Sequence, residues 1–437
     1  MKDSSYLIDD FNQAYLHDAS QEIMDLYANL NPYRDHTVEE EDNRGRIIRR
    51  PLFSHSSLGQ PNALNLQEIK MEEFDWQSNT SYIVLMHHHQ ELAAANLQLI
   101  PKNILDYIRK GKCKLILDNT LEGDSVNKFY PVLYNSITNL NIPPSKVYYI
   151  TNNLIADQIH TQYKDHNPRN TYINVIPFMW NVNDVSRLIS QKALPATVVV
   201  EEEIQYKRDN RGKIRHFLKV NRTDREQRNL MMLFLNKYNI LEKSLISFPN
   251  LPNHHHYNFG TLFEDITDQE NQDDLKLKTP FDIDNTDRTN HGDPGYEVGN
   301  FNADLPFQPI HYKNTFISIV MGAFPETLGA CHLHSSTFNP MYCGHPIIQY
   351  GPFRALKELK RRGFKTFDKW WDESYDEIYN SDERLRAVMD LVLEISKKST
   401  TEMFIMYESM KEVLEHNIQV IRNYDIKKEL KYKVYEQ

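Results

Sequence analysis

The chain has 437 residues, of which 40% are hydrophobic and 25% charged, a composition typical of globular proteins and unlike that of disordered or fibrous chains. A chain of this length has room for two domains. The net charge of −10 argues against non-specific coating of nucleic acid or of an acidic membrane. Three cysteines, no apolar signal core and no apolar run of roughly 20 residues indicate a cytoplasmic protein without membrane association.

The first part of the chain predicts one parallel sheet. Residues 1–75 form a polar segment, and its acidic run at 39–42 is expected to be a solvated loop. Residues 76–205 then alternate short apolar runs with amphipathic stretches, which predicts a doubly wound domain because strands separated by helices pair in parallel. The expected strands are 82–86, 114–118, 146–151 and 172–178, and the expected helices are 101–110 and 125–139.

A second pattern of the same kind covers residues 206–400. Between the two lies an expected connection at 185–213, which includes a strand-like run at 196–202. The expected strands of the second domain are 216–220, 244–248, 315–323 and 346–351, and the expected helices are 225–238 and 353–362. Residues 401–437 carry apolar side chains at helical spacing, which predicts a helix that packs on a core.

Two stretches of the second domain resemble a glycosyltransferase-like family of the GT-B type that is common in phage and marine bacterial genomes. The first is an Asn-Arg…Arg turn after a strand, with Asn221, Arg222, Arg225 and Arg228 matching. The second, at 335–376, carries Gly-His-Pro at 344–346, Gly-Phe-Lys-Thr-Phe at 363–367 and Asp-Glu-Ser-Tyr-Asp at 372–376. The resemblance covers residues 215–425.

The resemblance implies two Rossmann-like domains that face each other across a cleft. A nucleotide-sugar would bind to residues 206–400, the acceptor to residues 76–205, and the helix at 401–437 would pack back toward the first domain. The implied activity is that of a hexosyl- or pentosyltransferase that needs no metal and no cofactor beyond its nucleotide-sugar substrate. The acceptor would be a glycan or a hydroxymethylated base of phage DNA, in which case the protein would work in the host cytoplasm.

The residues themselves suggest where the donor diphosphate binds. The planar fork of arginine binds phosphate oxygens bidentately, and a turn after a strand lies at the carboxyl edge of a parallel sheet, where ligands of such sheets bind. Hydroxyl groups at a helix start provide further donors, although ordinary N-capping is the alternative. A solvated basic turn is the alternative for the arginines. The donor-site candidates are Asn221, Arg222, Arg225, Arg228, Ser335, Ser336 and Thr337.

Candidates for the catalytic base lie in the first domain. Glycosyl transfer with inversion needs one group to take a proton from the acceptor hydroxyl. His87 directly follows the strand at 82–86, while Asp118 and Glu122 lie at or just after the end of the next strand. Each of the three is also compatible with a structural role.

Two departures from the family pattern leave an inactive protein as the alternative function. The family has a Glu in the strand where this chain has Gly322, and another where it has Ser335 or Ser336. In GT-B enzymes an acidic residue near this point holds the donor ribose. Glu326 is the nearby substitute, and without one the chain would be a catalytically inactive binding or structural protein.

Two further clusters have a structural interpretation beside the functional one. Asp372, Glu373 and Asp376 are either substrate contacts or carboxylates of a structural loop that pair with nearby Lys and Arg, and the structural interpretation is favoured. The Cys-His-Leu-His run at 331–334 has soft ligands, but its spacing matches no standard zinc site. The sequence therefore predicts no metal ligands.

Overall fold

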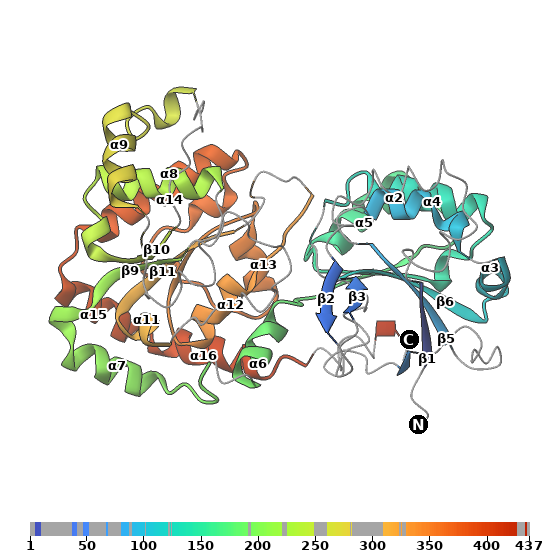
Figure 1. Ribbon diagram of the computed structural model, residues 1–437, viewed down its shortest axis with the longest axis horizontal. Coiled ribbons are helices and arrows are strands. Elements are labelled where there is room, and N and C mark those ends of the chain that lie inside the picture. Colours follow the sequence, from blue (N-terminus) through green and yellow to red (C-terminus); the bar gives the residue numbers. More distant parts are fainter. Residues whose placement is uncertain are drawn as a thin grey trace.

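A computed structural model defines the fold over most of the chain. It forms two parallel sheets, each with its own hydrophobic core, at the two ends of an elongated molecule (Figure 1). The predicted α/β class, with a Rossmann-like arrangement of two parallel sheets, is therefore confirmed. The structure describes residues 5–9, 37–41, 47–51, 67–68, 80–86, 90–100, 102–120, 123, 125–190, 194–220, 225–248, 260–279, 281, 309–322, 325, 329–425 and 433–434.

The first sheet contains the four strands that the sequence predicts and two more. These four are β5 (Thr80–Leu85), β6 (Cys113–Asn119), β7 (Val147–Thr151) and β8 (Asn174–Pro177), and they pair in parallel in chain order. β1 (Ser5–Asp9) pairs in parallel with β5, and β4 (Gln67–Glu68) extends that edge. The strands β1 and β4 were not predicted because short runs in polar surroundings give little periodic signal.

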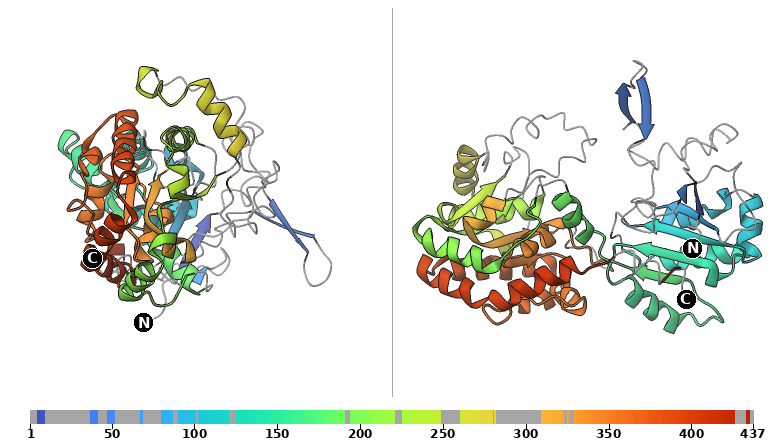
Figure 2. Two further views of the ribbon diagram at one scale, coloured as in Figure 1. Left: turned by 90° about the vertical axis from the view of Figure 1, so that its left-hand side faces the viewer. Right: turned by 90° about the horizontal axis from the view of Figure 1, so that it is seen from below.

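A hairpin replaces the solvated loop that the sequence predicts at 39–42. β2 (Thr37–Glu41) pairs antiparallel with β3 (Ile47–Pro51), and the register places Glu39 opposite Arg49. Opposite charges in facing positions favour such pairing, which the acidic run considered alone does not reveal. Figure 2 shows the hairpin projecting away from both sheets.

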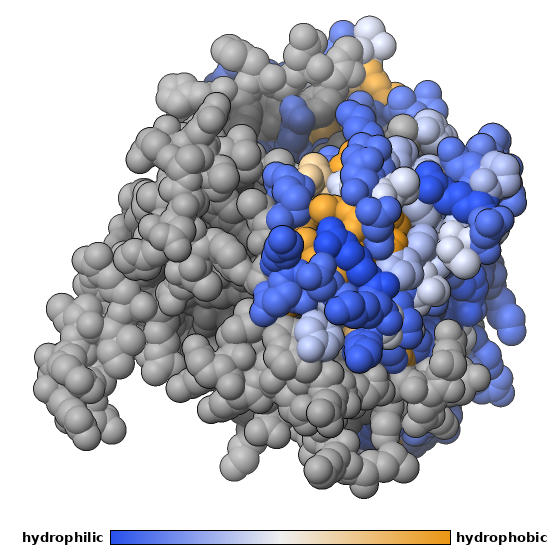
Figure 3. All heavy atoms as spheres, turned by 90° about the vertical axis from the view of Figure 1, so that its right-hand side faces the viewer, coloured by the Kyte–Doolittle hydropathy of each residue, from blue (hydrophilic) through white to orange (hydrophobic). Residues whose placement is uncertain are grey.

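Helices cover one face of the first sheet. α2 (Gln90–Ala95), α4 (Phe129–Asn139) and α5 (Ala156–His166) lie together on that face, and α3 (Lys102–Arg109) lies at its side (Figure 1). α3 ends as predicted before Gly111, whose φ of 68° is the left-handed conformation in which helices commonly terminate. The described surface at this end of the molecule is mainly hydrophilic (Figure 3), because the apolar side chains of these helices point inward.

The second sheet has the four predicted strands in the order β10–β9–β11–β12. Their bounds are β9 (Arg215–Val220), β10 (Ser244–Ser247), β11 (Thr315–Met321) and β12 (Ile347–Tyr350), and all neighbours are parallel. The chain leaves β9 toward one edge and returns to β11 on the other side of β9. In a sheet with this order, a crevice forms outside the carboxyl ends of the two central strands.

Helices cover both faces of the second sheet. In Figure 1, α8 and α14 lie on one face and α7, α15 and α16 on the other. The helices that follow β9 in the described part of the chain are α8 (Glu226–Lys237), α9 (Gln269–Lys278), α11 (Pro309–Lys313), α12 (Ser335–Tyr342), α13 (Ala355–Arg361), α14 (Ser381–Ser396), α15 (Thr400–Ser409) and α16 (Lys411–Arg422). Single 3-10 turns are η3 (Leu97–Leu99), η4 (Pro144–Lys146), η5 (Arg211–Lys213), η6 (Leu241–Lys243), η7 (Gly260–Phe263) and η9 (Ser374–Glu377).

The expected connection at 185–213 is wrong in its local structure. The strand-like run at 196–202 leads into a helix, α7 (Val200–Asp209), and α6 (Val182–Ser190) precedes it. α7 has three glutamates in its first turn and Lys207 and Arg208 in its last, charges that complement the helix dipole. Val185 on α6 and Ile204 on α7 belong to the core of the second half, so both helices pack there.

The expected single helix at 401–437 is two helices. α15 and α16 meet at Met410, and both pack on the second half, where Tyr407 and Leu414 are buried in its core. Only beyond α16 does the chain reach the first half. The backbone N–H of Met179 donates to the hydroxyl of Tyr424 at 3.0 Å, and the amine of Lys114 donates to the carbonyl oxygen of Val434.

Candidate functional site

The carboxyl edge of β9 and β11 holds two of the four predicted phosphate-binding residues. Arg225 is the N-cap of α8, and its carbonyl oxygen accepts hydrogen bonds from the backbone of Arg228 at 2.9 Å and of Asn229 at 3.0 Å. The guanidinium of Arg228 reaches across the sheet edge and donates to the carbonyl oxygen of Met321, the last residue of β11, at 3.3 Å. Asn221 and Arg222 lie outside the described residues.

The start of α12 lies at the same edge, and its three hydroxyl residues divide into two kinds. Thr337 is buried, and its hydroxyl donates to the side chain of Gln349 on β12 at 2.9 Å, so it fixes the helix to the sheet. Ser335 and Ser336 are half-buried. Of the predicted hydroxyl donors, these two are the ones whose position suits a ligand.

His334 is a site residue that the sequence analysis missed. It is the N-cap of α12, and its ring nitrogen Nε2 is buried without a hydrogen-bond partner among the described residues. Loss of solvent, followed by the cations of Arg228 and Arg225, lowers the pKa of His334 to about 4. The ring is therefore neutral at pH 7, and its pKa records that both arginines are neighbours.

Nothing in the local sequence distinguishes His334 from a surface histidine. In the sequence, the run at 331–334 suggests only a possible zinc site. Within the described residues, no group of three or more His, Cys, Asp and Glu could hold a metal ion. Cys331 and Cys343 are buried as free thiols, and burial raises their pKa.

The position of the missing glutamate in β11 is tightly packed. The backbone N–H of Gly322 donates to the carbonyl oxygen of Tyr350 at 2.7 Å. A Cβ at Gly322 would lie 3.2 Å from that oxygen and from the Cα of Gly351, closer than ordinary contact. A carboxylate side chain would thus require the neighbouring strand to move. Glu326, the expected substitute, lies outside the described residues.

Only one of the three candidate bases can be placed. Asp118, at the carboxyl end of β6, is 3% exposed, and its carboxylate accepts a hydrogen bond from the backbone of Thr120 at 3.0 Å. This contact gives Asp118 a role in forming the turn, and its role as a base stays a prediction. His87 and Glu122 lie outside the described residues.

The segment before α12 is bound directly to the carboxyl end of β7. The side chain of Asn153 accepts from the backbone of Cys331 at 3.0 Å and donates to the carbonyl oxygen of Gly329 at 2.8 Å. The backbone N–H of Leu154 donates to the carbonyl oxygen of Cys331 at 2.9 Å. The segment from Gly329 to Cys331 and the carboxyl edge of the first sheet are therefore in contact.

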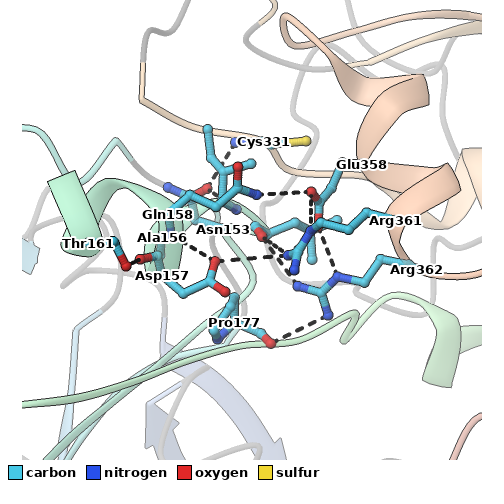
Figure 4. A network of polar contacts seen from close by, with 12 residues as sticks. Asn153, Ala156, Asp157, Gln158, Thr161, Pro177, Cys331, Glu358, Arg361 and Arg362 are labelled. Carbon is cyan, nitrogen blue, oxygen red and sulfur yellow. Dashed lines mark hydrogen bonds and ion pairs between the residues drawn. The ribbon is translucent and has the colours of Figure 1, made fainter.

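A buried carboxylate reinforces this junction (Figure 4). Glu358 on α13 accepts from the guanidinium groups of Arg361 at 2.7 Å and Arg362 at 2.9 Å, and from Gln158 of the first half at 3.2 Å. Both arginines also donate to the carbonyl oxygen of Leu154, at 3.1 and 3.2 Å. The network joins α13 to the turn after β7 and fixes how the two halves meet.

The acidic cluster at 372–376 is structural. The carboxylate of Asp376 accepts from the backbone of Leu356 and Lys357, each at 3.0 Å, and so caps the start of α13. Glu373 accepts from the hydroxyl of Thr366 at 2.5 Å and from the backbone of Phe367 at 2.8 Å. The expected pairing with nearby Lys and Arg is present at Glu373, which lies 3.5 Å from the amine of Lys360, and backbone N–H groups and a hydroxyl add to it.

The basic run from 207 to 228 is not one basic surface. Lys207 is 1% exposed and donates to the carbonyl oxygens of Tyr312, Lys313 and Thr315 at 2.7, 2.9 and 2.5 Å, which closes the end of α11. Burial lowers the pKa of Lys207 to about 7. Within the described part of this run, Arg228 reaches the end of β11. Lys219 on β9 is buried near Arg228, and burial, followed by the charge of Arg228, lowers the pKa of Lys219.

Comparison with known proteins adds no identity: no family model, curated protein or solved structure matches the chain. Among the described residues, no helix has the length and apolar character needed to cross a membrane. The function must therefore be argued from the site itself.

Proposed function

We propose that the protein is a glycosyltransferase that binds the diphosphate of a nucleotide-sugar at the carboxyl edge of β9 and β11. The observation that carries this proposal is the convergence of Arg225, Arg228 and His334 at the point where the strand order reverses. Cations and a neutral imidazole at such an edge suit a charged, oxygen-rich ligand. The start of α8, a 12-residue helix, adds backbone N–H groups to the same edge.

The proposed reaction needs charge stabilisation more than covalent help from the protein. The acceptor hydroxyl oxygen forms a bond to the anomeric carbon, while the bond between that carbon and the phosphate oxygen breaks. The electron pair leaves with the nucleoside diphosphate, and the hydroxyl proton passes to a base. Arg225 and Arg228 would balance the charge that grows on the departing phosphate. For this reason we propose no essential divalent metal.

The acceptor is proposed to bind to the first half, across a cleft between the halves. A glycan or a hydroxymethylated DNA base presents the hydroxyl that the reaction requires. Asp118, Glu122 and His87 are the candidate bases, since each follows a strand of the first sheet. The GT-B resemblance of residues 215–425 supports this division of labour.

A catalytically inactive binding protein on the same fold is the second candidate. Two observations favour it: any side chain at Gly322 would crowd the backbone of Tyr350 and Gly351, and Asp118 is buried in its own turn. Such a protein would still bind nucleotide through Arg225 and Arg228. Only turnover separates the two candidates.

Calorimetric titration with a panel of nucleoside diphosphates tests the binding site. Arg228→Ala should weaken binding by about 1.5–3 kcal/mol, the range for a hydrogen bond to a charged group, or about tenfold or more. Arg386→Ala is the matched control, because Arg386 on α14 pairs with Asp265 at 2.8 Å. Equal affinities in the two variants would remove Arg228 from the site.

An assay of nucleotide-sugar hydrolysis tests the activity. An enzyme should release nucleoside diphosphate slowly even without the true acceptor, because water can replace the acceptor hydroxyl. Release that is lost in Arg228→Ala and kept in Arg386→Ala supports the transferase. Tight nucleotide binding without release from any donor supports the binding protein.

A further inference from the structure

A second histidine lies between the first half and His334. His332 is 6% exposed, and its ring stacks on that of His334 with centroids 4.3 Å apart and planes 28° apart. Burial, followed by the neighbouring His334, lowers the pKa of His332 well below its ordinary value. His332 is therefore a neutral ring held against the candidate donor-site residue.

Hydrogen bonds from the first half fix the tautomer of His332. The side-chain amide of Asn181 donates to the carbonyl oxygen of Leu333 at 2.6 Å, which settles which end of the amide carries hydrogen. The same amide nitrogen lies 2.9 Å from Nε2 of His332, and that of Asn152 lies 3.0 Å from it. Because an amide nitrogen only donates, Nε2 must accept, and the ring proton must be on Nδ1.

The other side of His332 is blocked by backbone. A Cβ at Gly123, in the segment after β6, would lie 2.3 Å from the Cβ of His332 and 2.6 Å from its Cγ. The side chain thus packs directly on the bare backbone of Gly123. The orientation of the His332 ring is therefore fixed by the amides of Asn152 and Asn181, the backbone of Gly123 and the ring of His334.

We propose that His332 is a positioning residue that carries the placement of the first half to the donor site by fixing the ring of His334. Asn152 directly follows β7 at the carboxyl edge of the first sheet, and Asn181 lies in the connection between β8 and α6. His334 has no hydrogen bond at Nε2 within the described part of the chain, and its ring stacks on that of His332. The role in donor binding rests on the proposed function.

Nuclear magnetic resonance of ring nitrogens tests the positioning without any ligand. The protein is labelled with ¹⁵N-histidine, and the two rings are assigned by single His332 and His334 variants. In the double variant Asn152→Ala/Asn181→Ala, the signals of His334 should move together with those of His332. Asn167→Ala is the control, because that amide donates to the carbonyl oxygen of Tyr163 within α5 and should move neither ring. Unchanged His334 signals in the double variant would overturn the proposal.

A second variant covers a failure of the double variant to fold. His332→Phe keeps a ring for the stack and loses the nitrogen that accepts from both amides. His334 should again shift, because the replacement ring is no longer held by the first half. If His334 keeps its wild-type signals in this variant, the proposal is wrong.

Nucleotide affinity then shows whether the positioning serves the donor site. His334→Ala should weaken nucleoside diphosphate binding about tenfold in the wild-type background and less than about twofold in the Asn152→Ala/Asn181→Ala background. Equal losses in both backgrounds would mean that the amides do not act through His334. If the wild-type protein binds no nucleotide, the proposed function fails, and the ring signals alone decide the positioning.

Discussion

Two histidines of the second half, 334 and 345, differ in how their rings are used. His345, within the Gly-His-Pro motif, is 1% exposed, and its nitrogens lie 2.9 Å from the hydroxyl of Ser318 and from the carbonyl oxygen of Thr315. His334, just before the motif, is half-buried and leaves Nε2 without a hydrogen bond among the described residues. His345 therefore holds the fold, whereas His334 has a buried nitrogen that no described residue bonds.

The same contrast separates the two helix starts at this end of the sheet. The first backbone N–H groups of α13 are taken by the carboxylate of Asp376, a residue of the strongest motif match. The N-cap of α12, His334, makes no side-chain capping bond, and Ser335 and Ser336 are half-buried. Polar groups that the protein satisfies internally should affect stability when removed, and groups left open should affect binding.

The largest effect is expected from the most fully satisfied carboxylate. Glu358→Ala removes a buried carboxylate that pairs with Arg361 at 2.7 Å and with Arg362 at 2.9 Å. Removing one partner of a buried pair costs roughly 3–5 kcal/mol, so the free energy of unfolding should fall by about that amount. Urea unfolding measures it. Glu377→Ala is the control, because its pair with Arg354 is half-exposed on both sides. Equal losses in the two variants would contradict a buried network at the junction.

The two histidines should respond in opposite ways to the same substitution. His345→Ala removes the ring that bonds the buried hydroxyl of Ser318 and opens a cavity, while the carbonyl oxygen of Thr315 keeps its bond from Lys207, so the variant should lower the free energy of unfolding by about 2–4 kcal/mol. Nucleotide affinity of the folded protein should not change. His334→Ala should lower nucleotide affinity about tenfold and cost less than about 1 kcal/mol of stability. Thermal melting and calorimetry on the same samples would show it, and a reversed pattern would break the comparison.

Acid should reveal that His334 is neutral in the folded state. Its pKa of about 4 lies below the ordinary value near 6.5 in an unfolded chain. The unfolded state therefore binds the proton first, and the stability contributed by the neutral ring is present above about pH 6.5 and lost as the pH falls toward 4. His334→Gln should reduce the acid-induced loss by about 1–3 kcal/mol. Unfolding curves at pH 7 and pH 5 give the loss of free energy of unfolding for the wild type and for His334→Gln. The same loss in both proteins would refute the lowered pKa of His334.

The smallest effect is expected from removing metal. If the arginines balance the diphosphate charge, EDTA should leave nucleotide binding and donor hydrolysis unchanged. Activity measured with EDTA, and then with added Mg²⁺ or Mn²⁺, is the check. Activity that disappears and returns with either ion would replace the proposed mechanism with a metal-assisted one.

Buried strands were the most predictable part of the molecule. Short strands of four to seven residues with apolar side chains near their centres mark β5 to β8 and β9 to β12, because strands buried on both faces need apolar side chains. The run at 196–202 misled for the same reason, since Val198, Val199 and Val200 suggest a strand. The glutamates at 201–203 favour a helix start, and α7 is what forms.

The candidate site was less predictable than the fold. Arg225 and Arg228 were found because a turn after a strand has a fixed place in a parallel sheet. His334 was not, since its nearness to both arginines depends on how Cys331 binds the turn after β7 and how Leu333 binds Asn181 after β8. Contacts between residues so far apart in the chain leave no periodic trace in one sequence. The partners of the carboxylates at 372–376 were also not predictable, because residue types do not reveal bonds to backbone N–H groups.

The contacts that Leu154 makes with the second half affect the order in which the protein can fold during synthesis. Its side chain belongs to the core of the second half, and its backbone N–H and carbonyl oxygen bond to Cys331, Arg361 and Arg362. The ribosome releases the first sheet long before these partners exist. Until then the turn after β7 presents an apolar side chain and open backbone groups to solvent, a surface that favours aggregation. An isolated first half should therefore be prone to aggregation, and the junction should be among the last parts of the molecule to form.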